Sequence, residues 1–199
     1  LRHGFIEHVS ILESMRNTMA SGILRSRVAH VQQRSARDTR GVLSFGAMTI
    51  PCALGRSGVV ALKREGDGAS PRGLWSIREI YYRADRVARP ATDLPVRRLR
   101  PDQAWCDVSG DRNYNRLVRL PYSVLDERLW RKDGLYDIIG VLSHNVRPRV
   151  QGLGSAIFLH VAREGYLPTA GCVALALEDL QRLLAYRGGP AMIRFGPSH

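Results

Sequence analysis

Residues 156–175 contain two apolar runs joined by a short loop. The first run ends in His160, the loop contains Gly165 and Pro168, and Cys172 follows His160 after 12 residues. Such a run is typical of a buried strand, and a loop with glycine and proline can turn the chain back on itself. His160 and Cys172 are then expected at adjacent strand ends, where an imidazole can take the proton of a thiol. From the spacing alone, a satisfied core histidine and an inert buried cysteine remain open alternatives.

The composition fits one soluble globular domain. At 199 residues the chain can bury a sizeable core, and its 44% hydrophobic and 24% charged residues are ordinary for that class. The three cysteines, Cys52, Cys106 and Cys172, are scattered and form no CxxC pair. They are too few for a disulfide framework and lack the spacing of a zinc or redox site. We therefore expect no metal, no cofactor and at least one free thiol.

The net charge is +12, from 30 lysines and arginines against 18 acidic residues. A surface of this kind attracts polyanions such as nucleic acid, anionic lipid or an acidic cell-wall polymer. The basic residues are spread along the chain, and no RRM, KH or zinc-finger signature is present. Sequence-specific binding of nucleic acid is therefore not expected.

The N-terminal segment differs in character from the rest of the chain. Residues 1–40 lack the apolar core, about 7–15 residues long, of a secretory signal. The chain has no run of about 20 apolar residues that could span a membrane. Apolar residues recur at spacings of three and four at Ile6, Val9, Leu12, Met15, Met19 and Ile23. We expect a helical or weakly ordered extension over residues 1–26 and one folded domain over residues 27–199.

Short apolar or alternating runs dominate the rest of the chain. The runs expected to form strands are residues 28–31, 41–45, 48–54, 59–62, 74–82, 136–142, 155–161 and 191–195. Gly46 and Ala47 are expected to form the tight connection of a hairpin.

Helical patterns are fewer. Residues 177–186 carry leucines at helical spacing after two acidic residues, which predicts a helix. Ser123 is expected to begin another helix, with an apolar face made of Leu125, Leu129 and Trp130. Many strands with two or three helices predict a mainly β fold, either a β-sandwich or a partly open barrel.

Polar and aromatic residues without periodicity occupy residues 105–107 and 111–115. Such stretches are typical of a loop that lines a site, although a turn held by Asx hydrogen bonds is an open alternative. The candidate substrate-binding residues are Trp105, Tyr114, Asn115 and Thr169.

Several stretches together resemble one known family. In order along the chain these are KREGDGASPRGLWSI, WCDVSGDRNYNRLV, LWRKDGLYDIIGVL, SAIFLHV, PTAGCVAL, EDLQRLL and AMIRF. This order of elements resembles the L,D-transpeptidase catalytic domain (YkuD-type), in a compact branch seen in Gram-negative bacteria. The similarity covers roughly residues 41–195.

The resemblance implies a cysteine that attacks a carbonyl of a tetrapeptide stem in peptidoglycan, expels D-Ala and passes the acyl group to an amine. It implies Cys172 as the nucleophile, His160 as the base, and the backbone N–H groups of Gly171 and Cys172 as the oxyanion hole. His144 is the weaker candidate for the base, because its polar Ser-His-Asn turn is expected to be solvated. The resemblance also implies peptidoglycan stem peptides as partners and a periplasmic or cell-envelope location, with the cytoplasm as the alternative. A monomer is expected.

Three departures from the family pattern affect what the site does. Val161 stands where the family usually has glycine, the spacing of 12 residues between His160 and Cys172 is short, and Ala174 replaces a usual arginine. We expect another arginine, Arg112 or Arg163, to supply the missing charge. A peptidoglycan amidase, an L,D-carboxypeptidase and a non-catalytic wall-binding module remain alternatives.

Overall fold

The computed structural model describes residues 27–35, 38–122 and 127–196. Its main feature is a closed ring of eight strands. In order around the ring these are β11 (Ile138–Leu142), β12 (Phe158–Val161), β13 (Val173–Leu175), β3 (Met48–Ala53), β2 (Arg40–Phe45), β1 (Val28–Gln33), β14 (Met192–Phe195) and β6 (Gly73–Tyr82). The pairing of β6 with β11 closes the ring, and β7 (Val96–Arg98) adds to β6 outside it.

Strand β6 makes this closure because its ten residues pair on both edges. One edge pairs first with β14 and then with β7, and the other edge pairs with β11. A strand of ordinary length, about five or six residues, would leave the barrel open at this point.

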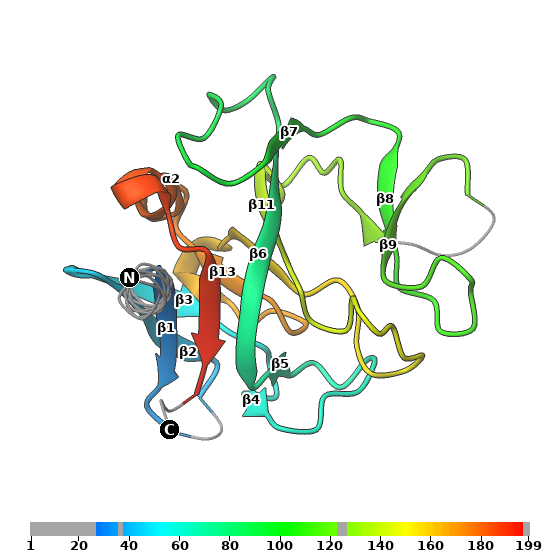
Figure 1. Cartoon of the computed structure of the whole chain (residues 1–199), viewed down its shortest axis with the longest axis horizontal. Helices are drawn as coiled ribbons and strands as arrows, with labels where there is room; N and C mark the ends of the chain where they lie inside the picture. Colours follow the sequence, from blue (N-terminus) through cyan, green and yellow to red (C-terminus); the bar gives the residue numbers. More distant parts are fainter. Residues whose placement is uncertain (1–26, 36–37, 123–126, 197–199) are drawn as a thin grey trace, which may run out of the picture.

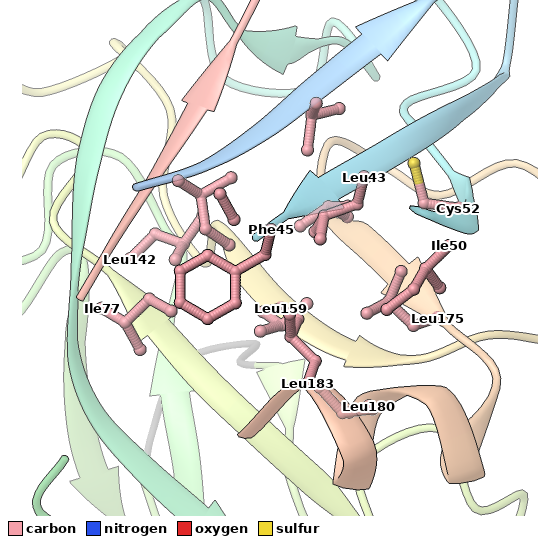
Figure 2. Close-up of a cluster of buried hydrophobic side chains, with 14 of the residues drawn as sticks. Leu43, Phe45, Ile50, Cys52, Ile77, Leu142, Leu159, Leu175, Leu180 and Leu183 are labelled. Atoms are coloured by element: carbon pink, nitrogen blue, oxygen red, sulfur yellow. The ribbon is translucent and has the colours of Figure 1, made fainter. Parts of the chain in front are cut away.

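The main core fills the inside of the ring. Every ring strand contributes buried apolar side chains to it, because alternate residues of a strand point to opposite faces. Helix α2 (Leu177–Ala185) adds Leu180, Leu183 and Leu184, all fully buried. Figure 2 shows Leu180 and Leu183 directed toward Leu159 and Leu175 of the ring. Each such side chain contributes about 1.5–3 kcal/mol by leaving water.

A second core lies on the outer face of the ring. It contains Tyr81, Leu99, Trp105, Leu129, Tyr136, Ile139, Val141, Phe158 and Cys172. A small sheet of β8 (Gln103–Cys106), β9 (Arg116–Arg119) and β10 (Glu127–Arg128) covers this face. In Figure 1, β8 and β9 lie on the opposite side of the molecule from β1 and α2. A two-stranded sheet of β4 (Val59–Val60) and β5 (Ser70–Pro71) completes the strands.

The mainly β class is confirmed, and so is the hairpin at Gly46 and Ala47, where Phe45 pairs with Met48. The number of helices is lower than predicted. Within the described residues α2 is the single α-helix, accompanied by short 3-10 turns at Glu164–Tyr166 and Tyr186–Gly188. The predicted extension over residues 1–26 lies outside the described residues.

The helix predicted from Ser123 is wrong where it can be examined. Residues 123–126 lie outside the described residues, and Glu127–Arg128 forms strand β10. Glu127 pairs with Trp105 of β8, and Leu129 is buried in the outer core. Pairing with β8 therefore makes this segment a strand, although the spacing of Leu129 and Trp130 is compatible with a helix.

Candidate active site

The site is built on the parallel pair β12 and β13. Leu159 pairs with Val173 and His160 with Ala174. Leu159 and Val173 point into the barrel core, so the residues before and after them point to the outer face. This alternation places Cys172 beside Phe158 and puts His160 on the same face, about 6.6 Å farther along the strand.

The thiol of Cys172 is held by backbone groups of the chain that enters β12. Its Sγ atom accepts a hydrogen bond from the Phe158 N–H at 3.3 Å and donates one to the Ala156 carbonyl at 3.2 Å. Ala156 has a positive φ of 51°, which bends the chain just before the strand. Burial raises the pKa of Cys172 to about 12, although the Phe158 N–H lowers it. The resting sulfur is therefore a neutral thiol.

His160 is also buried and neutral. Burial lowers the pKa of His160 to about 4, with smaller contributions in the same direction from the positive charges of Arg131 and Arg163. Its Nδ1 atom lies 2.8 Å from the Val161 carbonyl oxygen. Because a carbonyl only accepts, Nδ1 carries the proton and Nε2 keeps a lone pair. The ring packs edge-to-face on Tyr136, with centroids 5.3 Å apart.

The turn before Cys172 requires glycine. Gly171 has a φ of +142°, and a Cβ atom there would lie 2.8 Å from the Ala69 carbonyl oxygen. The Thr169 hydroxyl donates to the Cys172 carbonyl at 2.7 Å and accepts from the Gly171 N–H at 3.1 Å. Thr169 thus fixes the turn, and it engages one of the two N–H groups assigned by resemblance to the oxyanion hole.

A cavity of about 680 Å³ opens over Cys172 and His160. Cys172, His160 and Thr169 line it. Its charged lining residues are the cations Arg56, Lys63, Arg131 and Arg163 and the carboxylates Glu65, Asp107 and Glu127. Apart from Arg163 and from Asp107, which lies in a stretch predicted to line a site, none of these charged residues was a predicted site residue, because they come from segments far apart in the sequence.

Trp105, Tyr114 and Asn115 are buried and are not among the lining residues. Tyr114 donates its hydroxyl proton to Glu65, which does line the cavity. Asn115 accepts from the Trp105 indole at 2.9 Å and from the Ala156 N–H at 3.2 Å. These residues support the wall of the cavity and the carbonyl that holds the thiol.

His144 is not solvated, contrary to the prediction. It is 9% exposed, it packs edge-to-face on Trp75 with centroids 4.7 Å apart, and its Nε2 donates to the Leu153 carbonyl at 2.9 Å. The large Trp75 ring comes from β6, so the polar neighbours of His144 in sequence gave no sign of its burial. His144 is not among the residues that line the cavity.

The three departures from the family pattern do not all lie in the cavity, because Val161 packs against the barrel core. Ala174 is 1% exposed, lines the cavity and stands opposite His160. Of the two arginines expected to replace the missing charge, Arg163 lines the cavity and Arg112 does not. Within the described residues no group of three or more metal-binding side chains gathers, and no helix has the length and apolar character to cross a membrane.

The sequence model of one protein family, the L,D-transpeptidase catalytic domain (YkuD), matches residues 32–187. The match spans most of the ring and contains every residue that lines the cavity. Comparison with curated proteins and with solved structures gave no match.

Proposed function

This chain belongs to the L,D-transpeptidase (YkuD) catalytic domain family, and from that premise we propose that it performs cysteine-dependent acyl transfer on peptidoglycan stem peptides. One observation carries the proposal. The thiol of Cys172 and the ring of His160 share the outer face of two paired strands and line the same cavity. A thiol and a neutral imidazole that line one cavity are the two groups that thiol acyl transfer needs.

The first half-reaction starts from a neutral pair. Burial disfavours both the Cys172 thiolate and the His160 imidazolium, so proton transfer accompanies attack instead of preceding it. His160 Nε2 takes the thiol proton while sulfur bonds to the substrate carbonyl carbon. The C–N bond to D-Ala then breaks, and the leaving amine takes that proton from Nε2. A thioester on Cys172 remains.

Thr169 has a defined part in this step. Its hydroxyl bridges the Gly171 N–H and the Cys172 carbonyl and so orients both ends of the turn that carries the nucleophile. Stabilising the developing oxyanion with the Gly171 N–H requires that this N–H turn from Thr169 toward the substrate oxygen. Thr169 is then a positioning residue for the turn.

Arg163 is our candidate for the charge that Ala174 lacks. It follows His160 by three residues, lines the cavity, and lowers the pKa of His160 after the larger effect of burial. We expect Arg163→Gln to raise the KM of a donor with a free carboxylate about tenfold, with an unchanged rate of thiol alkylation. Arg112→Gln, outside the cavity lining, is the matched control and should leave KM unchanged.

The deciding experiment is incubation of the full chain with peptidoglycan fragments that carry tetrapeptide stems. Release of D-Ala with a new 3–3 cross-link, both lost in Cys172→Ala, supports transpeptidation. Release of D-Ala without a cross-link identifies an L,D-carboxypeptidase, and cleavage of another amide identifies an amidase.

A wall-binding module is the remaining candidate. It predicts that wild type and Cys172→Ala retain the fragments equally and that neither forms a thioester. The proposal also places the protein in the cell envelope, where peptidoglycan is found. Fractionation of cells expressing the natural gene tests this location, and recovery in the cytoplasm alone would contradict it.

A further inference from the structure

Glu127 is a carboxylate in an unfavourable place for the first half-reaction. It lines the cavity from β10, and its side chain is 32% exposed. Its negative charge contributes to raising the pKa of Cys172, after the larger effect of burial, and so opposes a thiolate. It likewise raises the pKa of Tyr136, whose ring contacts His160. Because the charge of Glu127 opposes formation of the thiolate, Glu127 is not expected to assist the first half-reaction.

The other cavity carboxylates do not share this position. Glu65 accepts hydrogen bonds from the hydroxyls of Tyr114 and Ser155, so the cavity wall already holds its carboxylate. Neither Glu65 nor Asp107 is among the causes that shift the pKa of Cys172. Among the carboxylates that line the cavity, Glu127 is thus the one whose charge raises the pKa of the Cys172 thiol, after the larger effect of burial.

Glu127 accepts a hydrogen bond from the Tyr136 hydroxyl, and its ion pair with Arg131 is weak. Its Oε1 atom lies 3.4 Å from the Arg131 guanidinium, whereas Asp133 binds the same guanidinium at 2.5 Å. Arg131 keeps its tighter partner if Glu127 turns toward a ligand. A half-buried carboxylate that can exchange a weak partner for a stronger one is suited to bind a cation.

We propose that Glu127 binds the ammonium group of the acyl acceptor and directs its nitrogen to the thioester on Cys172. The inference rests on the proposed function and deepens it, because it assigns the acceptor position to the part of the cavity lined by Glu127, Tyr136 and His160. The acceptor ammonium binds near Glu127 only after acylation. This order explains why a carboxylate lies near Cys172 although its charge opposes formation of the thiolate.

In the second half-reaction the acyl group passes from Cys172 to the acceptor nitrogen. The acceptor binds as an ammonium, and one of its protons leaves to solvent by way of the Glu127 carboxylate. The nitrogen bonds to the thioester carbonyl carbon as a second proton passes to His160 Nε2. The C–S bond breaks, and the sulfur recovers its thiol proton from Nε2. The products are an amide, the free enzyme and one released proton.

The test compares Glu127→Gln with Asp133→Asn. Each variant removes one carboxylate from Arg131, but only Glu127 lines the cavity. The full chain is given a tetrapeptide donor with a stem-peptide acceptor, and cross-linked and hydrolysed products are counted together with the rate of acyl-enzyme formation. An acceptor with its amine acetylated gives the background.

For Glu127→Gln we expect the ratio of cross-linked to hydrolysed product to fall about tenfold, while acylation stays equal to wild type or becomes faster. Asp133→Asn should leave the ratio within about twofold, and Glu127→Asp should retain part of it. An unchanged ratio in Glu127→Gln overturns the inference, and so does an equal fall of acylation and cross-linking, which indicates structural damage.

The same assay separates failure of the inference from failure of the proposed function. Wild type that forms an acyl-enzyme but gives only hydrolysed product overturns the acceptor position and leaves the thiol chemistry intact. Wild type that forms no acyl-enzyme overturns both.

Discussion

His160 of β12 lies directly opposite Ala174 of β13 in a parallel pairing. This register explains how a spacing of only 12 residues between His160 and Cys172 is enough to connect the two parallel strands. A connection between parallel strands needs about a dozen residues, and residues 162–172 provide eleven. The side chains at 172 and 174 point to the outer face with His160, so a minimal crossover still brings His160 and Cys172 to one cavity.

Cys172 should be the first thiol to react with iodoacetamide. All three cysteines are buried, but Cys172 is the one among the cavity-lining residues. Because burial raises the pKa of Cys172 to about 12, alkylation should be slow at pH 7 and should rise about tenfold per pH unit toward pH 9. Mass spectrometry of the labelled peptides measures the order. Prior labelling of Cys106 or Cys52 would contradict the assignment.

His160→Ala should slow acylation by about 10²–10⁴-fold, the usual effect of losing a general base. The matched control is His144→Ala, which also removes a buried imidazole. It leaves the Leu153 carbonyl without its partner and should lower the free energy of unfolding by about 1–3 kcal/mol. Its acylation rate per folded molecule should change less than tenfold. The reverse order of the two rates would refute the role of His160.

Asn115→Ala should weaken both the fold and the site. The Asn115 amide donates to the carbonyls of residues 144 and 145, and its oxygen accepts from the Ala156 N–H at 3.2 Å. Loss of these buried bonds should lower the free energy of unfolding by about 3 kcal/mol and loosen the carbonyl that holds Cys172. Urea unfolding and alkylation rates measure the two effects. Asn113→Ala, which loses a bond at a less buried position, should cost about 1 kcal/mol. Equal costs would contradict this account.

Stability should fall as the pH drops from about 6.5 toward 4. The pKa of His160 is lowered to about 4 by burial, whereas an unfolded histidine titrates near 6.5, so the unfolded state binds the proton first. The stabilisation is complete above pH 6.5 and is lost through this window, by about 3 kcal/mol in total. Urea titrations at pH 7.5 and 4.5 measure the difference. It should shrink in His160→Gln, and an equal loss in that variant would assign the effect elsewhere.

Much of the barrel could be predicted from the sequence, because most of its longer strands alternate or form apolar runs. Residues 41–45, 48–54 and 74–82 match β2, β3 and β6 closely. The leucines of residues 177–186 predicted α2 for the same reason, since one face of the helix is buried. The roles of Cys172 and His160 stay predictions, although both lie at one cavity.

The rest could not be predicted, because it depends on contacts between distant segments. All four residues of β8 are buried, so the strand shows no alternation that would reveal it. Strand β13 has only three residues and lies within the cysteine motif. In the sequence, Trp105 and Asn115 are equally compatible with a loop that lines a site and with a buried support for it. Their burial becomes evident only once the small sheet is seen to cover the outer face of the barrel.

The hydrogen bond from the strand backbone to the sulfur makes one amide group a probe of the chemical state of Cys172. The Phe158 N–H donates to Cys172 Sγ, and a thiol, a thiolate and a thioester differ as acceptors. In an ¹⁵N-labelled sample, the Phe158 resonance should shift downfield as the sulfur gains negative charge and upfield when it carries an acyl group. A single backbone peak could therefore be followed in real time through ionisation, acylation and release.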